Sequence, residues 1–178
     1  MIRFINILTI ARIFLAIIIF ILLSIGNNYF LALILFFLAG ISDYFDGYFA
    51  RRYNASSQLG EILDPIADKI LVIFLFFGIA INLSSYLIGF VGAFIITREI
   101  WVSALRDYNA QNGNMQATKV LYISKVKTSI QLLTLTIYLV ALSFNKMLLI
   151  IIGDIFLIIS LLITIYTGYI YTISTFRK

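Results

Sequence analysis

Six apolar segments follow one another along the chain, and each reaches about the 20 residues that a helix needs to cross the hydrocarbon layer of a membrane. They cover residues 4–25, 29–52, 60–82, 85–106, 118–142 and 147–172. Only 12% of the residues are charged, against about a quarter in soluble domains. We therefore predict an all-α polytopic membrane protein with six transmembrane helices, forming a single domain over residues 1–178. The first segment is expected to be a retained span rather than a cleaved leader.

Basic residues gather in alternate connections. Residues 26–28, 82–85 and 143–146 contain one basic residue between them, whereas the other membrane side collects most of the remainder. Because cytoplasmic connections carry an excess of Lys and Arg, we predict that both termini face the cytoplasm. The net charge of +5 is then a topology signal that also attracts anionic membrane lipids, and no nucleic-acid partner is expected.

Cysteine and histidine are both absent from the chain. This composition excludes disulfides, thiolate catalysis, Cys/His zinc sites and a histidine general base. Any chemistry must use carboxylates, cations or hydroxyls, and a metal bound by such groups would be a hard ion such as magnesium or manganese.

Four aspartates lie inside the second and third apolar segments, where an ionised side chain is costly and indicates a functional site. Asp43 and Asp46 are three residues apart, and Asp64 and Asp68 are four apart, so each pair shares one helix face. The short connection at residues 53–59 would make the two helices antiparallel neighbours. The four carboxylates would then meet near the cytoplasmic surface and hold a pair of divalent cations.

Two bound divalent ions suit phosphoryl transfer or a diphosphate leaving group, because they neutralise the attacking and departing oxygens. Gly47, Ala50 and Gly60 lie on the same faces and would let a ligand approach the backbone closely. Arg51 could form charge-assisted hydrogen bonds to phosphate oxygens.

The alternative structural interpretation is that the aspartates form buried ion pairs with Arg51, Arg52 and Lys69. Arg52 and Lys69 directly follow the two motif halves and are expected to extend to the interface, which leaves four acids against Arg51. A divalent-cation transporter would need polar residues through the outer halves of the spans, and these carry almost none. A membrane prenyltransferase would present two separate Asp-rich motifs on distant helices.

The acidic pattern resembles the signature of the CDP-alcohol phosphatidyltransferase family. The match is Asp43-x2-Asp46-Gly47-x2-Ala50-Arg51-x8-Gly60-x3-Asp64-x3-Asp68, without a departure. The resemblance implies six transmembrane helices, a homodimer and two divalent ions, Mg²⁺ or Mn²⁺. It implies transfer of a phosphatidyl group from CDP-diacylglycerol to an alcohol, with release of CMP. By position, metal ligands would be Asp43, Asp46, Asp64 and Asp68, the general base would be Asp68, and the CDP pocket would contain Gly47, Ala50, Arg51 and Gly60.

Basic residues inside the fourth and fifth segments bear on the acceptor alcohol. Arg98, Lys125 and Lys127 lie within the segments, where extension to the interface explains a cation less well than at a segment end. Cations beside a bound diphosphate would suit a phosphorylated acceptor. The alternative is that these residues are interfacial anchors, which we favour for Arg106 and Lys119.

Three further segments resemble those of bacterial phosphatidylglycerophosphate synthases within the family. They are residues 63–69, 98–106 and 124–128. The resemblance implies sn-glycerol 3-phosphate as acceptor and a place in the bacterial cytoplasmic (inner) membrane, with the site facing the cytoplasm. Inositol phosphate, serine and phosphatidylglycerol remain alternative acceptors.

Several polar residues outside these motifs have open roles. Asn6, Thr9 and Arg12 in the first segment could line the site or lie at the interface. Glu99 is expected to be the ion-pair partner of Arg98, and Asp154 is expected to be structural or interfacial.

Overall fold

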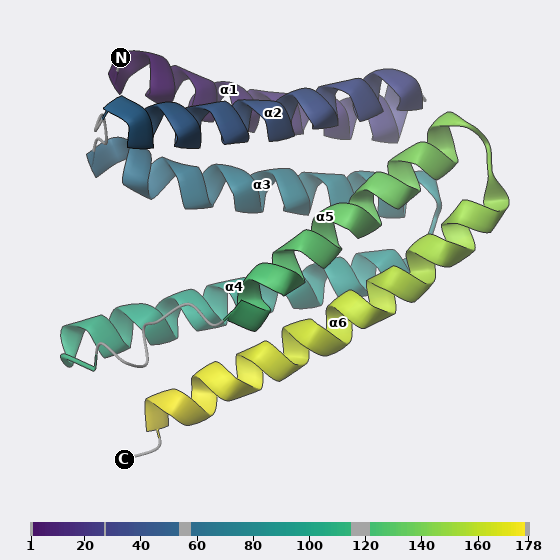
Figure 1. The fold of residues 1–178 in the computed structure, drawn as a ribbon. Helices are drawn as coiled ribbons and strands as arrows, with labels where there is room; N and C mark the ends of the chain where they lie inside the picture. Colours follow the sequence, from purple (N-terminus) through teal and green to yellow (C-terminus); the bar gives the residue numbers. More distant parts are fainter. Residues whose placement is uncertain (1, 27, 54–57, 115–121, 177–178) are drawn as a thin grey trace.

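The computed structural model describes residues 2–26, 28–53, 58–114 and 122–176. Within these ranges the side chains of residues 2–5, 46, 49–51, 53, 58–59 and 61 are not described. The described chain forms α1 (Ile2–Ile21), α2 (Tyr29–Tyr53), α3 (Gln58–Asn82), α4 (Tyr86–Gln111), α5 (Tyr122–Ser143) and α6 (Met147–Phe176) (Figure 1). A π-helical turn, Leu22–Gly26, continues α1. The all-α prediction is confirmed, and each helix covers most of one predicted apolar segment.

Tight polar turns join α3 to α4 and α5 to α6. Ser84 and Asn145 adopt left-handed backbone conformations, with φ of 49° and 54°, which reverse the chain within a few residues. Ser85 caps α4, because its Oγ accepts a hydrogen bond from the backbone N–H of Ile88 at 3.4 Å. Both helix pairs therefore pack as antiparallel hairpins.

The helices form two groups with α5 crossing between them (Figure 1). In one group α1 packs against both α2 and α3, and in the other α6 packs against α4 and α5, while α5 also contacts α2. The first turns of α1, α3 and α5 and the last turns of α2, α4 and α6 lie toward the same end of the bundle. Successive helices therefore run in alternate directions, as the distribution of basic residues over the connections predicts.

The prediction that α2 and α3 are direct neighbours is wrong for the described residues. Their backbones make no close contact there, and α1 packs against both of them. Two helices that turn carboxylates toward each other repel, whereas α1 brings Arg12 against both of them. The packing of α1 against both helices thus provides ion pairs where the carboxylates alone would repel each other.

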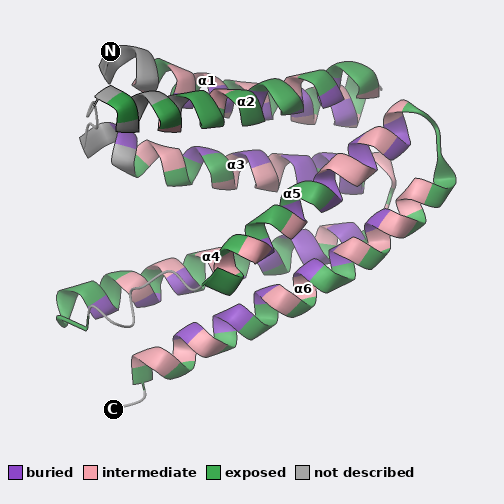
Figure 2. Cartoon of the chain, viewed as in Figure 1, coloured by how far each residue is buried: buried purple, intermediate pink, exposed green. Residues whose placement is uncertain are grey.

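Polar side chains lie inside the bundle and apolar ones outside it (Figure 2). Arg12, Thr134 and Thr164 are fully buried, whereas Phe14 is 62% exposed and Ile25 is 80% exposed. This distribution is typical of a protein whose outer surface is solvated by lipid, because apolar side chains then need no burial and polar groups must find internal partners.

Within the part of the chain that the structure describes, four helical segments are long and apolar enough to cross a membrane. They are Asn6–Gly26, Tyr86–Gln111, Tyr122–Ser143 and Met147–Phe176. In α2 the apolar stretch is shorter, Tyr29–Phe45, because the acidic motif and two arginines follow it. The protein is thus an integral membrane protein with four candidate spans, and the predicted spans in α2 and α3 are the two that carry the acidic motif.

The orientation of the bundle can be tested by labelling with thiol reagents, because the chain has no cysteine of its own. Gln111→Cys and Lys146→Cys place single thiols at exposed positions beside the α4–α5 connection and in the α5–α6 turn. We expect an impermeant maleimide to label Lys146→Cys in intact cells and Gln111→Cys only after permeabilisation. The opposite pattern would invert the predicted topology.

Candidate active site

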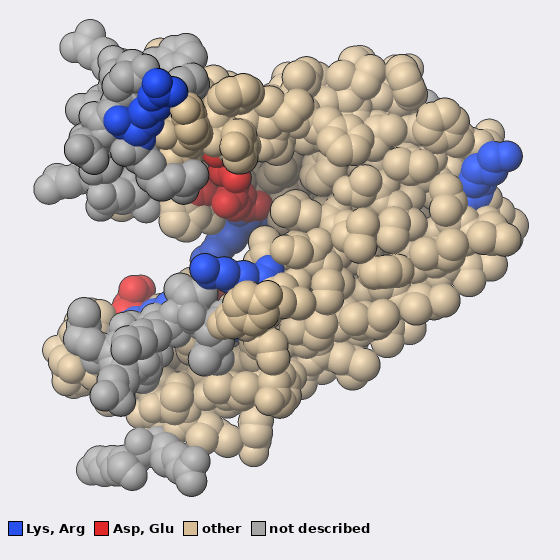
Figure 3. All heavy atoms as spheres, in the orientation of Figure 1, with Lys and Arg blue, Asp and Glu red and all other residues tan. Residues whose placement is uncertain are grey.

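A cavity of about 1130 Å³ opens between the two helix groups. Arg12 of α1 lies in its wall, together with side chains from α2, α3, α4 and α5. Figure 3 shows that the molecule is hollowed at the end that carries the termini, with acidic and basic side chains facing each other across the hollow. Deeper in the cavity the wall is apolar, with Phe36 and Phe37 of α2 and Leu132 and Leu133 of α5. The cavity therefore combines a charged mouth with an apolar interior.

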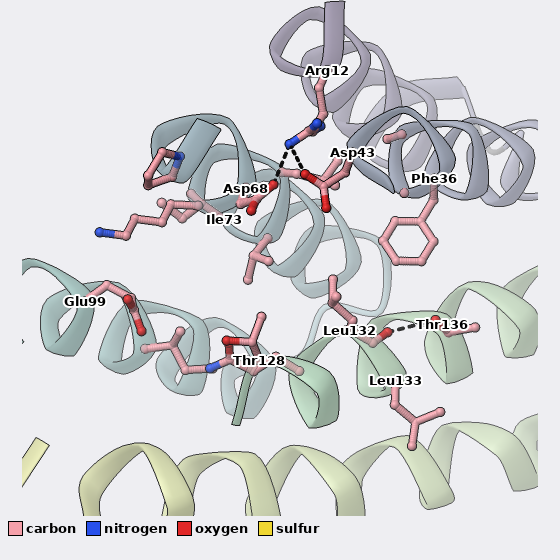
Figure 4. Close-up of a pocket in the computed structure, with 18 of the residues that line it drawn as sticks. Arg12, Phe36, Asp43, Asp68, Ile73, Glu99, Thr128, Leu132, Leu133 and Thr136 are labelled. Atoms are coloured by element: carbon pink, nitrogen blue, oxygen red, sulfur yellow. Dashed lines mark hydrogen bonds and ion pairs between the residues drawn. The ribbon is translucent and has the colours of Figure 1, made fainter. Parts of the chain in front are cut away.

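The charged mouth is organised around Arg12. Its Nη1 lies 2.7 Å from Oδ1 of Asp43 and 2.7 Å from Oδ1 of Asp68 (Figure 4). The arginine is fully buried, whereas the two carboxylates are half exposed and line the cavity. One guanidinium from α1 therefore holds carboxylates of α2 and α3 against the same point.

A second contact from α1 fixes the third described aspartate of the motif. Thr9, one turn before Arg12, is fully buried and donates a hydrogen bond from Oγ1 to Oδ1 of Asp64 at 2.7 Å. Thr9 and Arg12 share one face of α1, because residues three apart on a helix do so. We call Asp43, Asp64 and Asp68 the acidic cluster, and α1 contacts all three of its members.

The chemistry of the Asp43 and Asp68 carboxylates suits a hard divalent ion. Asp43 and Asp68 each bring an oxygen to within 2.7 Å of a single cationic nitrogen, so their carboxylates already converge on a positive charge, and oxygen ligands are those that Mg²⁺ prefers. The described side chains contain no group of three acids close enough to hold a metal ion. The side chain of Asp46, the fourth predicted ligand, lies outside the described residues.

Basic residues from α3, α4 and α5 lie at or behind the cavity mouth. Lys127 of α5 is almost fully buried and pairs with Oε1 of Glu99 on α4, which also accepts a hydrogen bond from Nη1 of Arg98 at 3.0 Å. Lys69 of α3 donates from Nζ to Oγ of Ser103 at 2.9 Å. We call Lys69, Arg98 and Lys127 the basic cluster. Lys69, Glu99 and Lys127 line the cavity.

The other predicted residues lie outside this wall or outside the described side chains. Arg98 does not line the cavity and instead packs behind Glu99, with its guanidinium 5.7 Å from the ring centroid of Tyr171 on α6. Lys125 borders a separate hollow of about 250 Å³ with Tyr122 and Ser129. Gly47 and Gly60 lie one turn from Asp43 and Asp64, on the side toward the α2–α3 connection. Ala50 and Arg51 are in α2, but their side chains are not described.

Three residues in or near the cavity have contacts that the sequence did not reveal. Lys69, expected to extend to the interface, lies in the cavity wall and bonds to α4. Glu99 pairs with Arg98 as predicted, and also with Lys127. The sequence left open whether Arg12 lines the site or lies at the membrane interface. Its spacing of three residues from Thr9, which places both on one helix face, was the only sequence feature that linked it to the site. Asp154 accepts a hydrogen bond from Tyr138 at 2.6 Å, away from this cavity, as a structural residue would.

Comparison with known sequences assigns the family. The profile of CDP-alcohol phosphatidyltransferases matches residues 4–166, which is most of the chain. The chain belongs to the CDP-alcohol phosphatidyltransferase family. The match includes the acidic cluster on α2 and α3, Arg12 on α1 and the basic cluster opposite them, so the family region contains the whole described mouth of the cavity.

Curated relatives within the family carry the name CDP-diacylglycerol–glycerol-3-phosphate 3-phosphatidyltransferase. Those of Salmonella typhimurium and Sodalis glossinidius are 41% identical to the chain over 98 residues, and that of Escherichia coli K12 is 40% identical over the same length. Each alignment covers 55% of this chain and 54% of the relative. The chain thus spans about half the length of the curated relatives it matches.

The Arg12 contacts predict a stability effect that can be measured without substrate. Arg12→Gln would leave Asp43 and Asp68 facing each other without their shared cation, and we expect a loss of about 1–3 kcal/mol in unfolding free energy. The value is below that of a fully buried pair because both carboxylates are half exposed. Thermal unfolding in detergent, without added metal, measures it.

Arg52→Gln is the matched control for this measurement. Arg52 is exposed and donates to the Tyr48 hydroxyl on its own helix, so its loss should change unfolding little. Equal unfolding temperatures for the two variants would contradict the central role of Arg12.

Proposed function

We propose that the protein transfers the phosphatidyl group of CDP-diacylglycerol to sn-glycerol 3-phosphate, giving phosphatidylglycerophosphate and CMP. The observation that carries the proposal is the cavity itself, whose charged mouth has an acidic wall and a basic wall and whose interior is apolar. A lipid diphosphate needs both an apolar channel for its acyl chains and a charged end for its phosphates. The names of the curated relatives support the same reaction.

The apolar part of the cavity accounts for the lipid portion of the donor. Phe36 and Phe37 on α2 and Leu132 and Leu133 on α5 line it between the two helix groups. Phe37 and Leu133 are nearly half exposed at the surface of the bundle, so the acyl chains can reach the bilayer sideways while the phosphates stay at the mouth. Burial of methylene groups there contributes to binding without constraining the reacting atoms.

The acidic cluster supplies the reactive end. In the proposal Asp46 joins the acidic cluster, and Asp43, Asp46, Asp64 and Asp68 would hold two divalent cations, Mg²⁺ or Mn²⁺, which would neutralise the diphosphate and the departing CMP. Gly47, Ala50, Arg51 and Gly60 adjoin the CDP moiety. Asp68 accepts the proton of the acceptor hydroxyl, whose oxygen bonds to the phosphorus that carries diacylglycerol. The bond from that phosphorus to CMP breaks, and CMP leaves with its phosphate.

The basic cluster is proposed to bind the acceptor. Lys69, next to Asp68 on α3, and Lys127 on α5 line the same cavity as Asp43 and Asp68, so a phosphate bound to these ammonium groups would direct the rest of the acceptor toward the acidic cluster. Arg98, packed behind Glu99, contributes positive charge without direct contact. Lys125 lies on the separate hollow and would act only in attracting anions to the membrane surface. We propose further that the protein works as a homodimer in a bacterial cytoplasmic membrane, with this mouth facing the cytoplasm.

The test of the reaction is CMP release by the purified full-length protein. CDP-diacylglycerol and Mg²⁺ are supplied with glycerol 3-phosphate, inositol 1-phosphate, serine or phosphatidylglycerol in separate reactions. We expect metal-dependent release with glycerol 3-phosphate alone. If CMP is released only with another acceptor, the phosphatidyl transfer stands but glycerol 3-phosphate is not the acceptor. If no acceptor leads to CMP release, the proposed activity is refuted.

A single substitution tests the role of Asp68. Asp68→Asn keeps the shape of the side chain but removes the proton acceptor, and we expect kcat to fall by a factor on the order of 10²–10⁴ while CDP-diacylglycerol still binds. Asp107→Asn, an exposed position on α4 outside the cavity, is the control and should keep its activity. Near-normal turnover by Asp68→Asn would show that another group takes the proton.

A further inference from the structure

Glu99 is an anion placed among the cations of the proposed acceptor site. Its side chain is 24% exposed and lines the cavity, whereas Arg98 and Lys127, its two partners, are at most 7% exposed. Figure 4 shows Glu99 across the cavity from Arg12, Asp43 and Asp68. An acceptor entering this wall therefore meets a carboxylate as well as ammonium groups.

Both cations contact the same carboxylate oxygen. Arg98 Nη1 and Lys127 Nζ each pair with Oε1 of Glu99. This arrangement fixes the carboxylate from α4 and α5 together, while the Glu99 side chain still lines the cavity. Lys69 is held beside this wall by Ser103, one helical turn after Glu99 on α4.

We infer that Glu99 determines acceptor specificity, by accepting a hydrogen bond from a hydroxyl group of a phosphorylated polyol whose phosphate binds Lys69 and Lys127. The inference rests on the proposed function and adds a recognition element to it. Arg98 holds Glu99 from behind and is a positioning residue in this scheme.

The physical basis of the selection is the difference between a hydroxyl and a phosphate oxygen. Inorganic phosphate near neutral pH is an anion that a carboxylate repels, and its P–OH groups lie on the same phosphorus that the ammonium groups hold. A polyol phosphate offers the same anion together with a hydroxyl donor, which satisfies the carboxylate instead of opposing it. Glu99 therefore weakens the binding of bare phosphate and strengthens that of the acceptor.

Enzyme kinetics can separate these two effects. The Michaelis constant for glycerol 3-phosphate and the inhibition constant of inorganic phosphate as its competitor are measured for the full-length protein with CDP-diacylglycerol and Mg²⁺. For Glu99→Gln we expect phosphate to inhibit at lower concentration and the ratio of the Michaelis constant to the inhibition constant to rise about tenfold or more, the effect of one charge-assisted interaction. Asp107→Asn should leave the ratio unchanged.

Glu99→Asp provides the second test, because it retains the negative charge that Arg98 and Lys127 require and withdraws the carboxylate by one methylene group. We expect the Michaelis constant for glycerol 3-phosphate to rise severalfold while phosphate inhibition stays close to wild type. A role in folding alone would not change the ratio in either variant.

The possible outcomes separate the specificity role of Glu99 from the proposed phosphatidyl transfer. Wild-type activity with an unchanged ratio in both Glu99 variants would overturn the specificity role and leave the proposed function intact. Absence of CMP release by the wild-type protein with glycerol 3-phosphate would overturn the proposed function, and the inference with it.

Discussion

The ion pairs of Arg12 with Asp43 and Asp68 are the contacts on which the rest of the site depends. Carboxylates on two helices repel more strongly in a membrane than in water, because the surrounding dielectric screens them less. A single buried guanidinium 2.7 Å from both removes that repulsion. It also accounts for the packing of α1 against both α2 and α3, since α1 carries the cation that both carboxylates share.

Charge compensation also explains the shape of the cavity. The carboxylates of Asp43 and Asp68 and the ammonium groups of Lys69 and Lys127 line one cavity, so each set attracts the part of a ligand that the other would repel. Between and below them the walls are apolar. A molecule that fits such a cavity is amphipathic and carries several charges at one end, which is the description of a lipid diphosphate.

Sequence patterns predicted the local features well and the contacts between distant segments poorly. The six helices and the spacing of Asp43, Asp64 and Asp68 follow from residues close together in the chain. The partnership of Arg12 with Asp68 joins residues 56 apart, and no periodicity predicts it. Lys125 shows how helical spacing separates neighbouring residues. Lys127 and Gln131 are four residues apart and share a buried face of α5. Helical periodicity places Lys125, two residues before Lys127, on a different face of α5 from Lys127.

Although α6 contributes no described residue to the cavity wall, it supports that wall from behind. The Tyr171 ring lies 5.7 Å from the guanidinium of Arg98 and 5.0 Å from that of Arg106, whose Nη2 donates to the Tyr171 hydroxyl. Gly168 allows this approach, since a Cβ there would lie 3.2 Å from Cγ of Arg98. An anionic ligand could draw Lys127 away from Glu99, but Arg98 is held by α6. The carboxylate thus keeps one permanent counter-charge whether or not the cavity is filled.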